Sequence, residues 1–155
     1  MTPFQIDVTL NSEEETIALA TMVAPRLAKG QCLLLSGEIG AGKSAFARAL
    51  IRARLGRYED VPSPTFTLVQ TYEHTDGDIW HCDLYRLSSV DEAIELGLDE
   101  AFDDAICLIE WPDRLGEFAP QNAAHLAFSA HDTNHHVTIS GSDEWAEIFQ
   151  GVGDV

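Results

Sequence analysis

The sequence predicts one α/β domain, spanning residues 1–155, that is built around a mixed β-sheet. Short segments of strand length alternate along the chain with segments rich in helix-forming residues. A phosphate-loop motif lies between an early apolar segment and a helical one, as it does in parallel α/β units. The length of 155 residues suits one domain with one core, and the sequence contains neither internal repeats nor a low-complexity linker.

Seven segments have the pattern of β-strands. Apolar and polar residues alternate in the first, which is typical of a strand with one buried face. The second and the fifth are continuous apolar runs, as expected for strands that are covered on both faces. Asp76-Gly77 lies between the third and the fourth, so these two are expected to form an antiparallel hairpin. The seven segments are 4–10, 32–35, 66–72, 79–82, 105–109, 126–128 and 137–139.

Four segments have the pattern of helices, namely 12–27, 43–55, 89–102 and 145–149. Ser12 and Ser89 each precede a glutamate by three residues, and this capping-box spacing predicts a helix start at both serines. Gly56 follows the second segment and ends it, while Gly97 interrupts the third. Ser142 is expected to cap the last, short segment.

Residues 37–44 have the sequence Gly-Glu-Ile-Gly-Ala-Gly-Lys-Ser, which is the complete phosphate-loop pattern. Glycines let the backbone wrap around a phosphate, and the N–H groups and the start of the following helix then attract the anion. Lys43 is expected to reach the β- and γ-phosphates, and the Ser44 hydroxyl to bind Mg²⁺. The residues predicted to contact the nucleotide here are Gly37, Glu38, Ile39, Gly40, Ala41, Gly42, Lys43, Ser44 and Ala45.

Two acidic residues end strands that are expected to lie near this loop. Asp83 follows the segment 79–82, and Glu110 follows the apolar run 105–109. Strand ends face the ligand crevice in open α/β sheets, where a phosphate-loop site uses an acid to hold Mg²⁺ or to orient the attacking water. We therefore predict that both acids serve Mg²⁺ and catalysis, and either role suits either residue. The alternative for each is a solvated acid at a strand end.

The chain carries 26 acidic and 9 basic residues, which gives a net charge of −17. Such a surface repels nucleic-acid phosphates and anionic lipids, so we expect no direct binding to either. The charge is uneven, because residues 26–57 hold seven basic residues and one acid, a net +6, whereas the remainder holds two basic residues and 25 acids, a net −23. The phosphate loop lies at the centre of the basic stretch, so part of this charge is interpreted as a field that attracts a nucleotide. No N-K-x-D guanine motif occurs, which favours ATP over GTP.

Cys32, Cys82 and Cys107 are widely separated and lie in apolar segments, without the C-x-x-C spacing of a redox or zinc site. This pattern predicts buried, reduced thiols.

The longest apolar run, 105–109, is far shorter than the roughly 20 residues that cross a bilayer, and no signal-peptide pattern occurs near the first residue. We therefore expect a cytoplasmic protein.

Three histidines and two arginines suggest further sites. His131, His135 and His136 lie in a polar stretch without another ligand at fixed spacing, so a solvated turn is favoured over a metal site. Arg86 and Arg114 are the only basic residues after the basic stretch. Surface ion pairs are their favoured role, with contact to phosphate or to a partner's acid as alternatives.

Three further motifs follow the phosphate loop along the chain. They are Ser63-Pro64-Thr65-Phe66-Thr67-Leu68-Val69, His81-Cys82-Asp83-Leu84-Tyr85-Arg86-Leu87 and Ile109-Glu110-Trp111-Pro112. In this order the four motifs resemble the bacterial TsaE family, the small P-loop ATPases of tRNA threonylcarbamoyladenosine biosynthesis. The resemblance extends from about Leu10 to Phe128, and Cys82 stands where an aromatic residue is common in the family.

The resemblance implies a three-layer α/β P-loop NTPase fold with a mixed, mostly parallel central sheet and an ATP–Mg²⁺ site at the strand tips. It implies that the lysine and serine of the phosphate loop hold the phosphates and the metal, while Asp83 and Glu110 serve Mg²⁺ and water. It further implies that Thr65 faces the γ-phosphate from a switch-like loop and that Trp111 lies near the nucleotide. The implied partner is the TsaB–TsaD heterodimer, in which TsaD transfers the threonylcarbamoyl group and which ATP hydrolysis would reset between turnovers.

Two other functions stay open on the residues alone. A small-molecule or nucleoside kinase would usually carry an arginine-rich lid, and the chain offers only Arg86 and Arg114 for one. A non-hydrolysing module, whose binding surface ATP switches, is less favoured because two acids accompany the phosphate loop.

With a net charge of −17, a component of tRNA modification is expected to act through protein partners and not to bind free tRNA. The acidic run 91–104 is a candidate docking face, and a solvated face is the favoured alternative.

Overall fold

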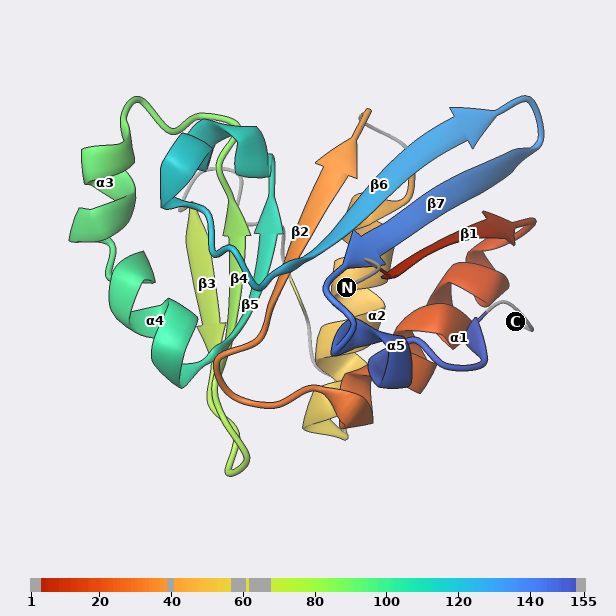
Figure 1. Cartoon of the computed structure of the whole chain (residues 1–155), viewed down its shortest axis with the longest axis horizontal. Helices are drawn as coiled ribbons and strands as arrows, with labels where there is room; N and C mark the ends of the chain where they lie inside the picture. The colour runs from red at the N-terminus through yellow and green to blue at the C-terminus, as the bar shows by residue number, and fades with distance from the viewer. Residues whose placement is uncertain (1–3, 39–40, 57–60, 62–67, 153–155) are drawn as a thin grey trace.

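The structure is a computed structural model that describes residues 4–38, 41–56, 61 and 68–152. Figure 1 shows the chain with its helices and strands labelled. The strands are β1 (Phe4–Leu10), β2 (Cys32–Gly37), β3 (Val69–Tyr72), β4 (Ile79–Asp83), β5 (Ile106–Glu110), β6 (Ala124–His131) and β7 (Asn134–Gly141). The α-helices are α1 (Glu13–Val23), α2 (Lys43–Leu55), α3 (Val90–Glu95), α4 (Leu98–Asp104) and α5 (Trp145–Ile148), and two 3₁₀ segments are η1 (Ala24–Arg26) and η2 (Pro112–Phe118).

The strands form one seven-stranded sheet in the order β1-β7-β6-β2-β5-β4-β3. β6, β2, β5 and β4 are neighbours and run parallel to one another. β7 pairs antiparallel with both β6 and β1, and β3 pairs antiparallel with β4, so β7 and β3 oppose the direction of the other five strands. The predicted mixed, mostly parallel sheet and the hairpin across Asp76-Gly77 are therefore confirmed.

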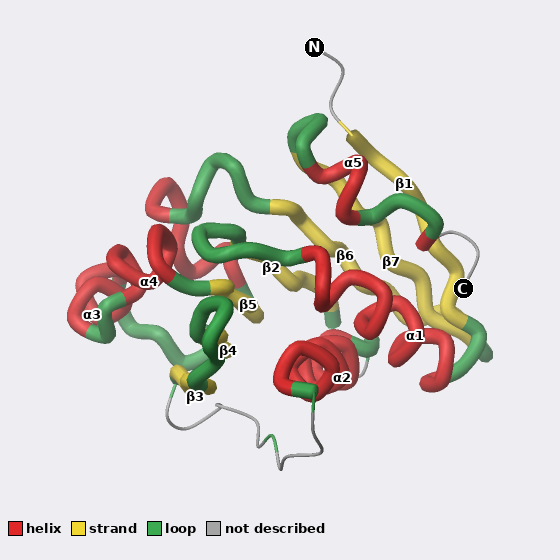
Figure 2. The backbone as a smooth tube through the Cα atoms, turned by 90° about the horizontal axis from the view of Figure 1, so that it is seen from below, coloured by secondary structure: helices red, strands yellow, loops and turns green. Residues whose placement is uncertain are grey.

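Helices cover both faces of this sheet. On β2, Leu33 and Leu35 pack into a core with α1 and α2, whereas Cys32 and Leu34 pack into a second core with α3, α4 and η2. Successive side chains of a strand point to opposite faces, so this alternation separates the two cores. Seen from below in Figure 2, α1 and α2 lie on one side of the sheet and α3 and α4 on the other. This is the predicted three-layer α/β arrangement.

Two of the predicted helix ends have the expected chemistry. The Glu15 N–H donates to Ser12 Oγ over 3.2 Å, which caps the first turn of α1. Gly56 has a φ of +72° and ends α2, and its N–H donates to the Arg52 carbonyl oxygen. The sequence pattern at these two positions was sufficient because the capping contacts are local.

At the two other predicted caps, the helix start at Ser89 is confirmed without the side-chain hydrogen bond, and the cap at Ser142 is wrong. Ser89 precedes α3 without capping it through its side chain, and Glu92 instead accepts hydrogen bonds from both the N–H and the hydroxyl of Ser88. The residue before α5 is Glu144 in place of Ser142. Short terminal helices are held mainly by packing, and Trp145 of α5 is buried with its Nε1–H donating to the Asn122 carbonyl oxygen over 2.8 Å.

The late strands are longer than predicted, so the predicted solvated turn of the histidine-rich stretch is limited to Asp132 and Thr133. β6 continues to His131 and β7 begins at Asn134, so these residues pair at a tight hairpin. β7 lies between β6 and β1, and its backbone hydrogen bonds on both sides outweigh the polar composition of the segment. Within the described ranges, no group of three or more histidine, cysteine or acidic side chains could hold a metal ion.

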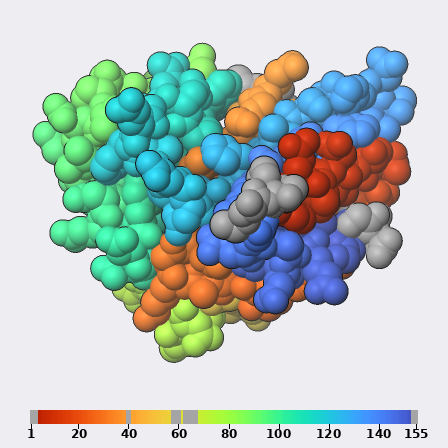
Figure 3. All heavy atoms as spheres, in the orientation of Figure 1, coloured from red at the N-terminus to blue at the C-terminus, as the bar shows by residue number. Residues whose placement is uncertain are grey.

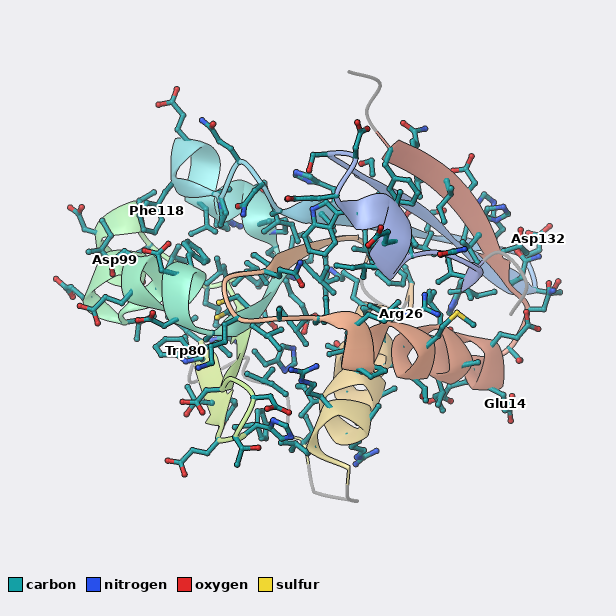
Figure 4. The ribbon with its side chains drawn as sticks, turned by 60° about the horizontal axis from the view of Figure 1, so that its bottom comes forward. Glu14, Arg26, Trp80, Asp99, Phe118 and Asp132 are labelled. Atoms are coloured by element: carbon teal, nitrogen blue, oxygen red, sulfur yellow. The ribbon has the colours of Figure 1, made fainter. Side chains whose placement is uncertain are left out.

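The helices α3 and α4 and the β6–β7 hairpin lie at opposite ends of the molecule (Figure 3). Figure 3 shows the surface of α3 and α4 at one end and the β6–β7 hairpin at the other. The first turns of α3 and α4 each carry two acidic residues, including Asp99, which Figure 4 shows at the α3–α4 end of the molecule.

No helix among the residues described has the length and apolar character needed to cross a membrane.

All three cysteines are buried and unpaired, as predicted. Burial raises the pKa of the Cys107 thiol to about 12 and the pKa values of the Cys32 and Cys82 thiols well above their ordinary range. The thiol is therefore the stable form at neutral pH, and the thiolate that reacts with electrophiles is scarce.

We predict that an aromatic disulfide reagent modifies none of the three cysteines in the native protein at pH 8. For Cys107, a pKa of about 12 leaves roughly one thiolate in ten thousand at that pH. The measurement is the release of chromophore with and without guanidinium chloride, in which all three thiols should react. Rapid stoichiometric reaction of the native protein would contradict the buried placement.

Candidate functional site

A cavity of about 730 Å³ lies at the carboxyl ends of the central strands, where the parallel segments of the sheet meet the start of α2. Its wall includes the phosphate-loop residues from Gly42 to Ala45 and both predicted strand-end acids, Asp83 and Glu110. In open α/β sheets, this edge is the one where ligands bind.

Two glycines shape the described part of the phosphate loop. Gly37 ends β2 with a φ of +129°, and a Cβ at this position would collide with the Phe128 carbonyl oxygen of β6. Gly42 has a φ of +109° and immediately precedes α2. Both positions need the conformational freedom of glycine, one at the end of β2 and the other just before α2. Ile39 and Gly40, also predicted to contact a nucleotide, lie outside the described residues.

Lys43 is held inside the cavity by two contacts. Its Nζ donates to the Gly37 carbonyl oxygen over 2.7 Å and lies 3.9 Å from the centre of the Trp111 ring. Lys43 is only 4% exposed, and this burial lowers its pKa, while the nearby carboxylates of Glu110, Asp83 and Asp113 act in the opposite direction. A cation thus lies where the motif requires one for a phosphate.

The two strand-end acids have different neighbours. Asp83 and Glu110 pair in register on parallel strands and are 8% and 3% exposed. The Ser44 hydroxyl donates to Glu110 Oε1 over 3.2 Å, and the Tyr85 N–H donates to Asp83 Oδ1 over 3.1 Å. Glu110 is therefore linked directly to the phosphate-loop serine, whereas Asp83 is tied to the backbone at the end of β4.

A buried histidine lies behind Glu110. His81 of β4 is 2% exposed, and its Nε2 lies 2.7 Å from Glu110 Oε2. The sequence motif contained His81, but nothing in its pattern distinguished this residue from an ordinary core histidine. The two carboxylate oxygens of Glu110 therefore contact different side chains, Ser44 on one side and His81 on the other.

Trp111 also lines the cavity. Its backbone is left-handed, with φ of 60° and ψ of 53°, and its N–H donates to the Leu35 carbonyl oxygen of β2. The Tyr85 ring packs against the Trp111 ring at a centroid distance of 5.1 Å. The Arg114 guanidinium lies 5.9 Å from the centre of the Tyr85 ring and makes a cation–π contact with it. Arg86 lines the cavity.

Several predicted residues occupy other places. Glu38 is exposed and Ala41 is fully buried in the core, and neither lies among the residues that line the cavity. Thr65 lies outside the described residues, so its expected place near the γ-phosphate stays a prediction. Ala45 does line the cavity.

Part of the basic stretch serves the fold instead of the cavity. Arg26 Nη1 donates to the Ile148 and Gln150 carbonyl oxygens over 3.0 and 2.7 Å, and Figure 4 labels this side chain at the end of α1 nearest α5. Arg54 Nη1 donates to the Ala24 carbonyl oxygen over 3.0 Å. Of the seven basic residues in this stretch, those that line the cavity within the described ranges are Lys43 and Arg48.

One wall of the cavity was missed by sequence reasoning. It consists of residues 10–13 and Thr16 at the start of α1, together with Thr133, Asn134 and His135 of the β6–β7 hairpin. Asn134 Nδ2 donates to Asn11 Oδ1 over 3.4 Å, and Figure 4 shows the neighbouring residues Glu14 and Asp132 at the same end of the molecule. These segments meet because β1 and β7 pair, a contact between distant residues that no local motif signals.

A comparison with known families adds to this geometry. The sequence profile described as "Threonylcarbamoyl adenosine biosynthesis protein TsaE" matches residues 10–138. The chain belongs to the TsaE family. The TsaE proteins of the family are named for tRNA threonylcarbamoyladenosine biosynthesis, and membership assigns this chain to that process.

Individual TsaE proteins and a solved structure agree with this assignment. The chain is 41% identical over 126 residues to TsaE of Rickettsia conorii, covering 81% of this chain and 72% of that protein. It is 34% identical over 142 residues to TsaE of Bacillus subtilis, covering 91% and 82% of the two chains. The crystal structure of Bacillus subtilis YdiB has the same fold, with a TM-score of 0.81, 27% identity and coverage of 99% and 97%. Family and fold together indicate a nucleotide-binding protein.

We predict that Gly37→Ala destabilises the protein more than Gly56→Ala. Both glycines have positive φ, which costs about 1 kcal/mol for alanine, but a Cβ at Gly56 meets nothing within 4 Å. The collision at Gly37 should cost about 1–3 kcal/mol more, and it should also weaken nucleotide binding because the Gly37 carbonyl oxygen holds Lys43. Urea unfolding of both variants measures this difference, and equal losses of stability would contradict it.

Proposed function

We propose that this chain is a Mg²⁺-dependent ATPase that binds the TsaB–TsaD complex and drives its turnover. The observation that carries the proposal is the convergence of Lys43, Ser44, Asp83 and Glu110 on one cavity at the strand ends. These residues come from the phosphate loop and from two different strands, and phosphoryl transfer requires such groups around one phosphate chain.

The phosphate chain would bind at the start of α2. In this proposal Lys43 exchanges its hydrogen bond with the Gly37 carbonyl oxygen for a phosphate oxygen, while the backbone N–H groups of the loop bind the other oxygens. Trp111 would stay beside the ammonium group and limit its contact with water. The buried position strengthens the attraction between Lys43 and the phosphates.

The oxygen donors beside Lys43 fit a magnesium ion. Ser44 Oγ and Glu110 Oε1 lie 3.2 Å apart, and hydroxyl and carboxylate oxygens suit this hard cation. We assign Ser44 and Glu110 to the metal, which when bound would offset the charge of the phosphates. The carboxylates of Asp83 and Glu110 beside Lys43 would weaken the attraction of the site for phosphates, so a metal ion bound there would strengthen nucleotide binding.

Asp83 is the acid that we assign to the attacking water. Its Oδ1 accepts the Tyr85 N–H, which fixes the carboxylate at the end of β4 on the wall of the same cavity. A fixed carboxylate can orient a water molecule by accepting a hydrogen bond from it. In this proposal Glu110 binds the metal and Asp83 orients the water, two roles that the sequence left open for either acid.

The base and ribose would lie toward α1 and the β6–β7 hairpin. Besides Ser44, the cavity is lined by Arg48 of α2, by Asn11 and Thr16 at the start of α1, and by Asn134 of the hairpin. The two amide side chains offer both donors and acceptors, which suits the edge of a purine base. The absence of an N-K-x-D motif favours adenine in this position.

A protein partner would raise the rate of hydrolysis and use it. The chain carries a net charge of −17, which disfavours direct contact with tRNA and makes action through the TsaB–TsaD complex the consistent route. The acidic run 91–104 is one candidate docking face for that complex.

We predict that Lys43→Ala, Asp83→Ala and Glu110→Ala each lower the rate of ATP hydrolysis by at least about 100-fold while the fold stays intact. The measurement is phosphate release from ATP with and without the TsaB–TsaD pair. Asp143→Ala and Glu144→Ala are matched controls, since both remove an exposed acid outside the cavity and should leave the rate unchanged.

The same assay separates the alternatives. No hydrolysis by the wild-type protein in any mixture would contradict the ATPase proposal and favour a module that only binds ATP. Phosphate appearing on an added metabolite would favour a kinase. Normal turnover of the Asp83 or Glu110 variant would remove that residue from the proposed mechanism.

A further inference from the structure

We propose that His81 is a positioning residue that fixes the Glu110 carboxylate in the orientation needed to support Ser44 and the metal. This inference rests on the proposed function of the cavity. It adds a role for a buried side chain that lies behind the cavity wall and does not itself line it.

The sheet brings the two side chains together. His81 is in β4, and Glu110 ends the neighbouring parallel strand β5. His81 pairs in register with Leu108, two residues before Glu110, so His81 and Glu110 are diagonal neighbours on one face of the sheet. Ile79 and Leu108 on the same face pack into the core with α2, the helix that carries Ser44.

The hydrogen bonds hold Glu110 at both ends of its carboxylate. Glu110 Oε2 lies 2.7 Å from His81 Nε2, and Glu110 Oε1 lies 3.2 Å from Ser44 Oγ. An ionised carboxylate can only accept, so in this state His81 donates through Nε2–H. With Oε2 fixed, rotation of the carboxylate away from Ser44 would break a buried hydrogen bond to a charged group.

Packing alone does not account for a histidine here. The side chain is 2% exposed, and its Nδ1 has no hydrogen-bond partner among the described residues. An apolar side chain would fill the same space without burying an unpaired nitrogen, which is unfavourable. The contact that compensates this cost is the one with Glu110. Groups that orient metal-binding carboxylates act in this way, and their removal weakens metal binding.

The proposal can be tested with two substitutions that differ in where they place an amide. His81→Gln can put an N–H near the position of Nε2, whereas His81→Asn is shorter and cannot reach Glu110 in the same way. Two quantities are measured for each: the Mg²⁺ concentration that half-saturates ATP binding, and the rate of hydrolysis with the TsaB–TsaD pair. ATP binding in the presence of EDTA serves as the reference for the fold of the cavity.

We expect His81→Asn to raise the required Mg²⁺ concentration and to lower the maximal rate by about 10–100-fold, with ATP binding in EDTA unchanged. His81→Gln should recover most of both losses. Unchanged values in His81→Asn, or equal losses in the two variants, would overturn the positioning role. A wild-type protein that binds Mg²⁺-ATP without hydrolysing it would contradict the ATPase proposal, whereas the Mg²⁺ titration would still test His81.

If the His81 variants fail to fold, NMR of the wild-type imidazole tests the same hydrogen bond. In the metal-free wild-type protein, ¹⁵N NMR of the imidazole should show the proton on His81 Nε2, protected from exchange with solvent. In Glu110→Ala this protection should be lost. An Nε2 without its proton, or protection that persists in Glu110→Ala, would overturn the proposal.

Discussion

The close approach of β2 to β6 at Gly37 is the constraint on which the site depends. In the backbone conformation of Gly37, a Cβ would collide with the Phe128 carbonyl oxygen, so glycine is required where the chain ends β2. Lys43, the first residue of α2, donates a hydrogen bond to the Gly37 carbonyl oxygen. Gly37 is therefore the residue at which the end of β2 contacts both β6 and the start of α2.

The parallel centre of the sheet explains why the chemical groups converge. β2, β4 and β5 end at the same edge, so the loop, Asp83 and Glu110 meet without any of them being close in sequence. Burial lowers the pKa of Lys43, whereas the carboxylates around it raise this pKa and favour the charged ammonium group. Ser44, Glu110 and His81 form a second line of contacts from the helix into the sheet.

Sequence patterns predicted the features that depend on neighbouring residues. The phosphate loop, the cap at Ser12, the turn at Gly56 and the strand-end acids all follow from local chemistry. The wall formed by Asn11 and Asn134 could not be predicted, because it arises from the pairing of β1 with β7, which are far apart in the chain. Which basic residues reach the cavity could not be predicted for a similar reason, since Arg26 and Arg54 bind carbonyl oxygens elsewhere in the fold, whereas Lys43 and Arg48 line the cavity.

We propose that Ser44 and Glu110 make nucleotide binding depend on a metal ion at the edge of the sheet. Calorimetric titration of ATP, with Mg²⁺ and with EDTA, into the wild-type protein and Ser44→Ala tests this dependence. We expect the wild-type protein to bind ATP at least about tenfold more tightly with Mg²⁺, and Ser44→Ala to lose most of this difference while still binding ATP in EDTA. Equal affinity of the wild-type protein for ATP under the two conditions would contradict a metal site at Ser44 and Glu110.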